Sequence, residues 1–292
     1  MRLPNILETT MDMRESKFRI EPLTGALGAE IHGVSLERPL GSDVFAGIQQ
    51  ALLDHLVIFF RDQELTPQQQ TSFARRFGEL DVHQYTAAME GHPEVIEIIK
   101  EPEETHNWGD NWHTDLTGLP EPPMGSILYA KEVPPFGGDT QWSNMYLAYE
   151  KLSDTMKQQI GGLRVVHASD SSTYQQFKGM TALAGPSHES EHPLVRTHPV
   201  TGKKSLFLAR KKMREIRGMK PPESAALLSF LCDHAENPDF ACRFRWRAGS
   251  VAFWDNRCTQ HRVTADYFYA ERGFPPHRRH MQRVTIKGDR PR

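Results

Sequence analysis

The chain has 292 residues, of which 38% are hydrophobic and 25% are charged, so it has a globular composition and enough length to bury a sizeable core. Its net charge of -2 gives no general attraction to nucleic acid or to a membrane, and no apolar run approaches the ~20 residues of a membrane span. The three cysteines lack CxxC spacing, which indicates free thiols in a reducing cytoplasm.

The first predicted elements are a leader, a helix and a strand. Residues 1–17 lack the apolar core of a signal peptide, and we expect a flexible leader before a single domain over residues 18–292. Residues 42–56 have the apolar spacing of an amphipathic helix, with Ser42 as the expected N-cap. The run VIFF at residues 57–60 follows as a short buried strand.

Three more helices are predicted along the chain. Thr66 and Pro67 mark the start of a helix over residues 66–80, because Thr caps free N–H groups and Pro fits the first helical position. Later helices are expected over residues 153–162, where two glycines end the pattern, and over residues 221–237.

The remaining apolar segments are short and are separated by Pro and Gly. Strands of this length and spacing favour a sandwich or barrel over a doubly wound sheet. We therefore predict a mostly β fold with flanking helices around a jelly-roll core. The expected strands are residues 95–100, 125–133, 163–169, 193–199, 204–209, 244–255 and 280–288.

Three His-x-Asp or His-x-Glu motifs occur, and one of them suits a metal best. His234 lies in a helical pattern, where side chains two residues apart point in nearly opposite directions. His92 adjoins a proline in an expected turn. His113 and Asp115 lie near the start of an extended segment, where residues two apart share a face, so both can reach one ion. The alternative is a surface histidine beside a turn-capping aspartate.

A third ligand would complete a set of two histidines and one carboxylate, which leaves open positions on non-haem Fe(II). The segment GSVAFWDNRCTQHRV presents His261 after an apolar strand and a turn-prone Asp-Asn pair. A core histidine bonded to backbone is the alternative. The competing donors by composition are His167, His198, His277 and His280.

Two arginines near the C-terminus are candidates for an anion anchor. A strand there places Arg279 and Arg283 on one face, and buried guanidinium groups require anionic partners. The planar guanidinium group suits a carboxylate or a sulfonate. The alternative is a ladder of salt-bridged arginines near a sheet edge.

Together these segments resemble the taurine dioxygenase (TauD/TfdA) family of Fe(II)- and 2-oxoglutarate-dependent dioxygenases. The resemblance covers nearly all of the chain after about Phe18 and includes VIFFRDQELTPQQQTSFARRFGEL, GDNWHTDLTG, WDNRCTQH and RRHMQRVTIKGD. It implies a double-stranded β-helix, a dimer or tetramer of identical chains, and Fe(II), 2-oxoglutarate and O2 as cofactor and co-substrates. It also implies hydroxylation of a small anionic organic substrate, with release of succinate and CO2 and frequent collapse of the product to an aldehyde or ketone.

The resemblance gives individual residues their roles. It implies that His113, Asp115 and His261 are the catalytic iron ligands. It implies that the Thr140 hydroxyl bonds to 2-oxoglutarate and that Arg279 pairs with the distal carboxylate of that molecule.

The residues expected to bind the primary substrate depart from the taurine enzyme. Arg283 and His83 match substrate contacts of the family, but Tyr85 falls one residue early, and Gly109 replaces an asparagine and so widens the site. We therefore expect a larger sulfonate, an alkyl sulfate or an aryloxy-carboxylate as substrate, and not taurine.

Two more departures are left open by the sequence. Arg210, Lys211 and Lys212 bring positive charge where the family has an acidic, aromatic segment, although a solvated basic turn is the simpler interpretation. The aromatic connection over residues 267–277 is longer than in the taurine enzyme, and it could cover the site or form a subunit contact.

Two other functions would fit the same ligands. One is a non-catalytic metal-binding jelly roll, and the other is a zinc-dependent hydrolase. Activity that requires Fe(II), ascorbate and 2-oxoglutarate, and that zinc inhibits, would exclude both.

Overall fold

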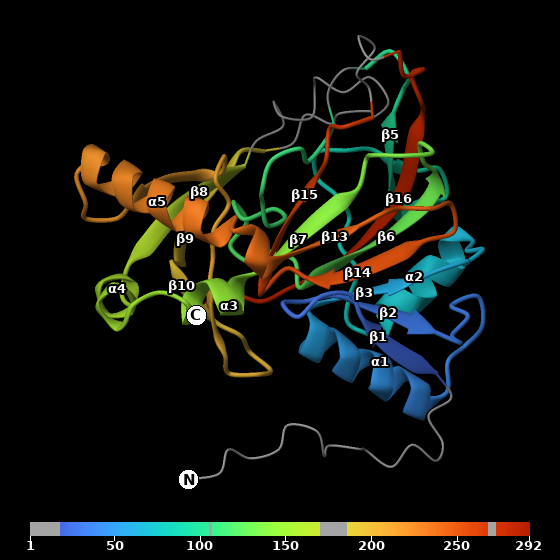
Figure 1. The fold of residues 1–292 in the computed structure, drawn as a ribbon, viewed down its shortest axis with the longest axis horizontal. Helices are drawn as coiled ribbons and strands as arrows, with labels where there is room; N and C mark the ends of the chain where they lie inside the picture. Colours follow the sequence, from blue (N-terminus) through green and yellow to red (C-terminus); the bar gives the residue numbers. More distant parts are fainter. Residues whose placement is uncertain (1–17, 105–106, 170–185, 268–272) are drawn as a thin grey trace.

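An eight-stranded sheet forms the largest layer of the protein (Figure 1). Its neighbouring strands run antiparallel except β2 and β3, which are parallel. In order across the sheet, the strands are β1 (Arg19–Pro22), β2 (Ala29–His32), β3 (Val57–Phe60), β14 (Val251–Asp255), β6 (Gly125–Glu132), β16 (Arg279–Ile286), β5 (His92–Lys100) and β4 (Ala88–Met89).

The computed structural model describes residues 18–104, 107–169, 186–267 and 273–292. The expected leader over residues 1–17 lies outside this described part of the chain. Within it, strands predominate and the helices lie at the margins, which confirms the prediction of a mostly β fold with flanking helices.

A second, three-stranded sheet packs against one face of the large sheet. It consists of β13 (Ala241–Phe244), β7 (Thr140–Asn144) and β15 (Thr259–Val263), in that order. Phe59 of β3 stacks on Phe244 of β13 with ring centroids 3.9 Å apart, and Trp142 and Trp254 fill the same layer. This aromatic core holds the two sheets face to face, and the candidate site lies against one end of the core.

Two helices cover the other face of the large sheet. They are α1 (Ser42–His55) and α2 (Pro67–Arg75), which share a second apolar core with β3. The run VIFF is buried at every residue because successive side chains of β3 enter opposite cores.

The starts of these two helices were not predicted equally well. Thr66 accepts a hydrogen bond from the Gln69 N–H and forms the capping box, as predicted. Ser42 does not cap α1; it is the first helical residue, Gly41 precedes it, and no side chain bonds the helix start.

The remaining elements form a third core beside the two sheets. It contains α3 (Met145–Glu150), α4 (Asp154–Ile160), α5 (Pro221–Ala235) and the short 3-10 turn η2 (Pro238–Phe240). Its strands are β8 (Arg164–Ser169), β9 (His188–Pro193), β10 (Val195–Thr197), β11 (Lys204–Leu206) and β12 (Met213–Ile216). They form one sheet in the order β12-β8-β9 and one pair, β10-β11.

Several predicted strands have other bounds in the structure. The segment 193–199 divides between the end of β9 and β10, and the segment 244–255 divides at a turn in which Gly249 has φ +81°. His92 is the first residue of β5 and does not lie in a turn before it. None of the described helices is long and apolar enough to cross a membrane.

Candidate metal centre and the two hollows beside it

The backbone holds two histidines from distant segments side by side. The His113 N–H donates to the His261 carbonyl over 3.0 Å, and the His261 N–H donates to the His113 carbonyl over 2.9 Å. The register of β15 against β7, where His261 lies opposite Trp142, fixes the position of this bridge. The two imidazole centroids are consequently only 4.2 Å apart.

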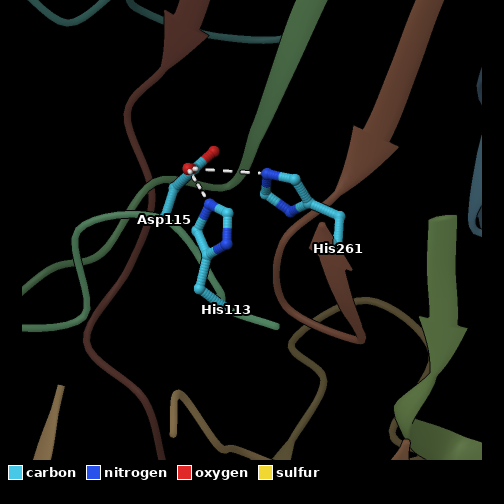
Figure 2. A group of neighbouring side chains, drawn as sticks. All are labelled: His113, Asp115 and His261. Carbon is cyan, nitrogen blue, oxygen red and sulfur yellow. Dashed lines mark ion pairs between the residues drawn. The ribbon is translucent and has the colours of Figure 1, made fainter. Parts of the chain in front are cut away.

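The side chains of both histidines point at one carboxylate oxygen, as Figure 2 shows. Asp115 Oδ1 lies 3.8 Å from Nε2 of His113 and 3.8 Å from Nε2 of His261. One ligand atom from each of the three residues lies within 4.8 Å of the other two. Two imidazole nitrogens and one carboxylate oxygen are suitable donors for Fe(II), and the residues that the sequence singles out therefore come together in space.

Hydrogen bonding fixes the tautomer of one histidine. Nδ1 of His113 lies 2.7 Å from the Asn111 carbonyl, which can only accept, so Nδ1 carries the proton. The lone pair is then on Nε2, the atom that faces Asp115. Burial lowers the pKa of His113, and it lowers the pKa of His261 to about 3, so both rings are neutral at neutral pH and can each donate a lone pair to a metal.

The carboxylate is held in place from its other side. Ser126 Oγ and Asn256 Nδ2 donate to Asp115 Oδ2 over 3.0 and 3.3 Å, and Arg283 Nη1 lies 3.5 Å from Oδ1. Burial opposes ionisation, but the charge of Arg283 outweighs it, with help from the Ser126 hydrogen bond, and the pKa of Asp115 is held below its usual range. The group is therefore a charged, oriented carboxylate.

A hollow on one side of the triad contains the first predicted arginine; we call it the Arg279 hollow. Arg279 is only 6% exposed, burial lowers its pKa, and its Nε has no hydrogen-bond partner among the described residues. Thr140, at the start of β7, opens into the same space. Its other lining residues are Ile98, Trp108, Gly109, His113, Leu128, Trp254, His261, Val263 and Arg283.

A second hollow lies on the Asp115 side; we call it the Lys212 hollow. It shares Trp108, Gly109, His113 and Arg283 with the first. Its own lining residues are Asn111, Thr114, Asp115, Leu116, Ser169 and Lys212. The two hollows therefore meet at the triad, and each contains one basic residue of its own besides the shared Arg283.

The four residues that line both hollows lie where the hollows meet. Arg283 is 5% exposed, and its guanidinium carbon lies 4.6 Å above the Trp108 ring, within the range of a cation–π contact. Gly109 has φ +85°, and a Cβ there would lie 3.1 Å from the His113 ring. The glycine therefore allows a left-handed turn directly against a metal-binding candidate, and the widening of the site relative to the taurine enzyme stays a prediction.

His83, which was expected to contact the substrate, and Tyr85, which departs from the family pattern, line neither hollow. His83 is 6% exposed, and its ring lies 6.3 Å from that of Trp108, but it does not line either hollow. Burial, followed by the charge of Arg283, lowers the pKa of His83 to about 3. Tyr85 is fully buried and donates to the Ser169 carbonyl over 3.4 Å.

The three basic residues that follow β11 have different surroundings. Arg210 forms salt bridges with Asp233 and Glu236, which fix it to α5. Lys211 lies 4.0 Å from Asp110 at the surface. Lys212 alone of the three lines a hollow; it lies in a turn and is half-buried.

His198, one of the competing histidines, is bound elsewhere. His198 donates from Nε2 to Asp255 over 3.1 Å, and its Nδ1 accepts from backbone N–H groups. With Cys258 these residues form a second group of close metal-type donors, but Arg257 already binds both oxygens of Asp255 over 2.9 and 2.6 Å. Burial opposes ionisation of Asp255, yet Arg257 holds its pKa below the usual range, so this group is a structural ion pair.

The other three donors do not join the triad either. His167 is buried against His192 and Phe207, and His280 bonds to Glu97 over 2.8 Å. His277 ends the long connection over residues 267–277, part of which, residues 268–272, lies outside the described chain. Tyr267, at the start of that connection, is fully buried and donates its hydroxyl to Asn107.

Among the site residues that were not predicted from sequence are Trp108, Ser126, Trp246 and Asn256. Asn256 alone had a local signal, because it lies in the WDNR turn that leads to His261. Ser126 lies in β6, whereas Trp108 and Trp246 lie outside the strands. All three reach the site through the packing of distant segments, which no short motif records.

Comparisons with known proteins show what the whole chain is similar to. A family model described as "Taurine catabolism dioxygenase TauD, TfdA family" matches residues 19–285. The alpha-ketoglutarate-dependent sulfate ester dioxygenase of Pseudomonas putida is 34% identical over 282 residues, which cover 93% of this chain and 90% of the relative. The (S)-phenoxypropionate/alpha-ketoglutarate-dioxygenase of Sphingobium herbicidovorans is 33% identical and covers 85% of this chain, with 89% of its own length matched. A solved structure of a taurine dioxygenase from Burkholderia xenovorans has a TM-score of 0.81 and 42% identity, over 94% of this chain and 93% of that one.

Proposed function

Because this chain belongs to the TauD/TfdA family, whose members are 2-oxoglutarate-dependent dioxygenases, we propose that His113, Asp115 and His261 bind its Fe(II). The enzyme uses Fe(II), 2-oxoglutarate and O2. The observation that carries the assignment of ligands is the aim of both Nε2 atoms at Asp115 Oδ1, with the His113 tautomer already fixed for ligation.

The bound iron would supply a site at which O2 oxidatively decarboxylates 2-oxoglutarate to succinate and CO2 while a substrate carbon is hydroxylated. The chain supplies geometry. Ser126 and Asn256 hold the carboxylate in one orientation, which supports metal affinity in the way that outer-shell partners do.

We place 2-oxoglutarate in the Arg279 hollow. Its distal carboxylate would pair with the Arg279 guanidinium and accept from the Thr140 hydroxyl. A buried cation whose Nε lacks a partner among the described residues is costly until an anion arrives, which supports this assignment.

We place the primary substrate in the Lys212 hollow, with its anionic group toward Arg283. The position of Lys212 supports a substrate with strong negative charge, and Gly109 leaves room beside the triad. The relatives are described as acting on sulfate esters and on phenoxypropionate. A larger sulfonate, an alkyl sulfate or an aryloxy-carboxylate therefore remains our proposed substrate, and collapse to an aldehyde or ketone would follow where an oxygen or sulfonate leaves the hydroxylated carbon.

The finer points of architecture belong to the same proposal. The eight-stranded sheet and the β13-β7-β15 sheet would form the two halves of a double-stranded β-helix. A single domain over residues 18–292, a homo-oligomer and a cytoplasmic location complete the proposal; the three cysteines are free and buried, which supports a reducing compartment.

The metal assignment is tested by comparing two aspartates. Asp115→Ala should abolish succinate release that depends on Fe(II), ascorbate and 2-oxoglutarate, because it removes a ligand. Asp110→Ala, an exposed neighbour that faces Lys211, should retain it. Activity with zinc and no 2-oxo acid would instead identify a hydrolase, and wild-type turnover by Asp115→Ala would contradict the ligand set.

The substrate class is tested with a panel. Succinate release should be stimulated more by alkyl sulfates, larger sulfonates or phenoxy acids than by taurine. Lys212→Met should lower kcat/KM for the best anionic substrate while leaving 2-oxoglutarate affinity unchanged, because the two bind in different hollows. Taurine as the best substrate by a wide margin would overturn the substrate proposal and leave the reaction class intact.

A further inference from the structure

A buried hydrogen bond joins the Arg279 hollow to the aromatic core beneath it. Trp246 Nε1 donates to Thr140 Oγ1 over 2.9 Å, and both residues are only 4% exposed. Trp246 follows β13, and its ring packs edge-on against Phe244 with centroids 5.1 Å apart. Phe244 lies opposite Thr140 in the register of β13 against β7. The indole is therefore held rigidly beneath the hydroxyl.

The hydrogen bond from Trp246 determines whether the Thr140 hydroxyl donates or accepts in its remaining contacts. An indole N–H can only donate, whereas a threonine hydroxyl has one proton to give and two lone pairs with which to accept. Since Thr140 accepts from Trp246, its proton remains for another acceptor. No acceptor for that proton is found in the described part of the chain, and Thr140 is one of the residues that line the Arg279 hollow.

Because the Thr140 hydroxyl accepts from Trp246 and keeps its own proton to donate, it favours a ligand with a hydrogen-bond acceptor at this position in the Arg279 hollow. A hydroxyl that already accepts a bond is also a better donor, because bonds in a chain polarise one another in a medium of low dielectric constant. An incoming carboxylate would meet the Arg279 charge and this oriented proton together. A ligand without an acceptor there would leave the proton unsatisfied.

We propose that Trp246 is a positioning residue for 2-oxoglutarate, and that it acts by fixing the Thr140 hydroxyl as a donor to the distal carboxylate. This inference rests on the proposed placement of 2-oxoglutarate beside Thr140 and Arg279. Trp246 does not line the hollow and would not touch the ligand. Its effect therefore passes entirely through Thr140, which gives the proposal a sharp test.

The test measures binding to the full-length protein loaded with Mn(II), so no turnover is needed. Calorimetric titration with 2-oxoglutarate should show affinity about 5- to 10-fold weaker for Trp246→Phe and about tenfold weaker for Thr140→Val. The double variant should bind like Thr140→Val alone, because Trp246 has nothing to orient once the hydroxyl is gone. Additive losses would overturn the proposal, since they would mean that Trp246 acts through packing.

A second ligand separates orientation from general damage. The 2-oxo acid 2-oxopentanoate ends in a methyl group and cannot accept from Thr140, so Trp246→Phe should weaken its binding by less than about twofold. The matched control is Trp142→Phe, because Trp142 is a fully buried indole of the same core whose N–H has no partner among the described residues. This control should leave both affinities unchanged. Equal losses for the two ligands in Trp246→Phe would contradict the proposal.

The outcomes also separate this inference from the placement on which it rests. If Thr140→Val binds 2-oxoglutarate normally, the placement itself is wrong. If Thr140→Val is weakened and Trp246→Phe is not, only the role of Trp246 fails. Should Trp246→Phe not fold, a benzothiophene analogue of tryptophan at residue 246 keeps the ring shape and removes the N–H, and it should give the same loss.

Discussion

Arg279→Met is expected to weaken 2-oxoglutarate binding by about 100-fold. The wild-type guanidinium is 6% exposed in the Arg279 hollow, where an ion pair is screened little by water. Removal of one partner of a buried charge pair costs about 2–5 kcal/mol, and Thr140 remains to hold the same carboxylate, so we take about 3 kcal/mol, which corresponds to about 100-fold. Met is chosen because it fills most of the volume that the arginine stem occupies.

The neighbouring residue provides the control. Arg278 points to the other side of β16, where its guanidinium bonds to Glu101 and Glu132 near the surface. Arg278→Met should therefore bind 2-oxoglutarate like the wild type. Titration of both variants in the Mn(II)-loaded state measures the difference directly.

Arg279→Met should weaken ligand binding, but it should not lower the stability of the ligand-free protein. Without ligand, the Arg279 charge is buried and its Nε is unsatisfied, so Arg279→Met should unfold at a temperature no lower than the wild type. Wild-type affinity in Arg279→Met, or an equal loss in Arg278→Met, would refute the placement of the distal carboxylate.

Three further predictions address the surroundings of the triad. Asn256→Ala removes a hydrogen-bond donor to the Asp115 carboxylate and should weaken Mn(II) binding about tenfold, as measured by an electron paramagnetic resonance titration. Unchanged affinity would show that this hydrogen bond does not contribute to metal binding. Gly109→Ala and its control Gly91→Ala both place a Cβ at positive φ, so each should lower the free energy of unfolding by about 1 kcal/mol. Only the Cβ at residue 109 would contact the His113 ring, so only Gly109→Ala should weaken Mn(II) binding. Asp255→Asn leaves a buried guanidinium without its anion and should cost about 3–5 kcal/mol in urea unfolding at neutral pH. Because the folded-state pKa of Asp255 is depressed, its contribution is lost as the pH falls below ~4, so the gap between the two proteins should narrow there, and a constant gap would count against this reasoning.

Much of the site could be predicted because its residues lie in motifs with local physical meaning. His113 and Asp115 lie two residues apart in one motif, although His113 forms only an isolated β-bridge and Asp115 begins a turn where an extended segment was expected. Parity along β16 places Arg279 and Arg283 on one face. The helix start at Thr66 and Pro67 is also encoded locally, since the cap depends on the next three residues.

Other features depend on contacts between segments far apart in the sequence. Strand β7 was not predicted, because its residues TQWSN are mixed in polarity and form a strand only between β13 and β15. The sequence did not distinguish Lys212 from its basic neighbours; only the fold shows that Lys212 lines the same hollow as Arg283, whereas Arg210 is bound to α5.

The sequence by itself determined the donor types, the anion anchors and the alternation of apolar residues that makes a mostly β protein. Only the tertiary structure decided which donors meet. His113 and His261 are 148 residues apart, and their bridge forms because β15 pairs with β7 in one register. A second register, that of β13 against β7, places Phe244 opposite Thr140 and brings Trp246, two residues later, to the Thr140 hydroxyl. Periodicity reports the face on which a side chain lies, but the partner across that face is fixed by long-range pairing and packing, which a local pattern does not contain.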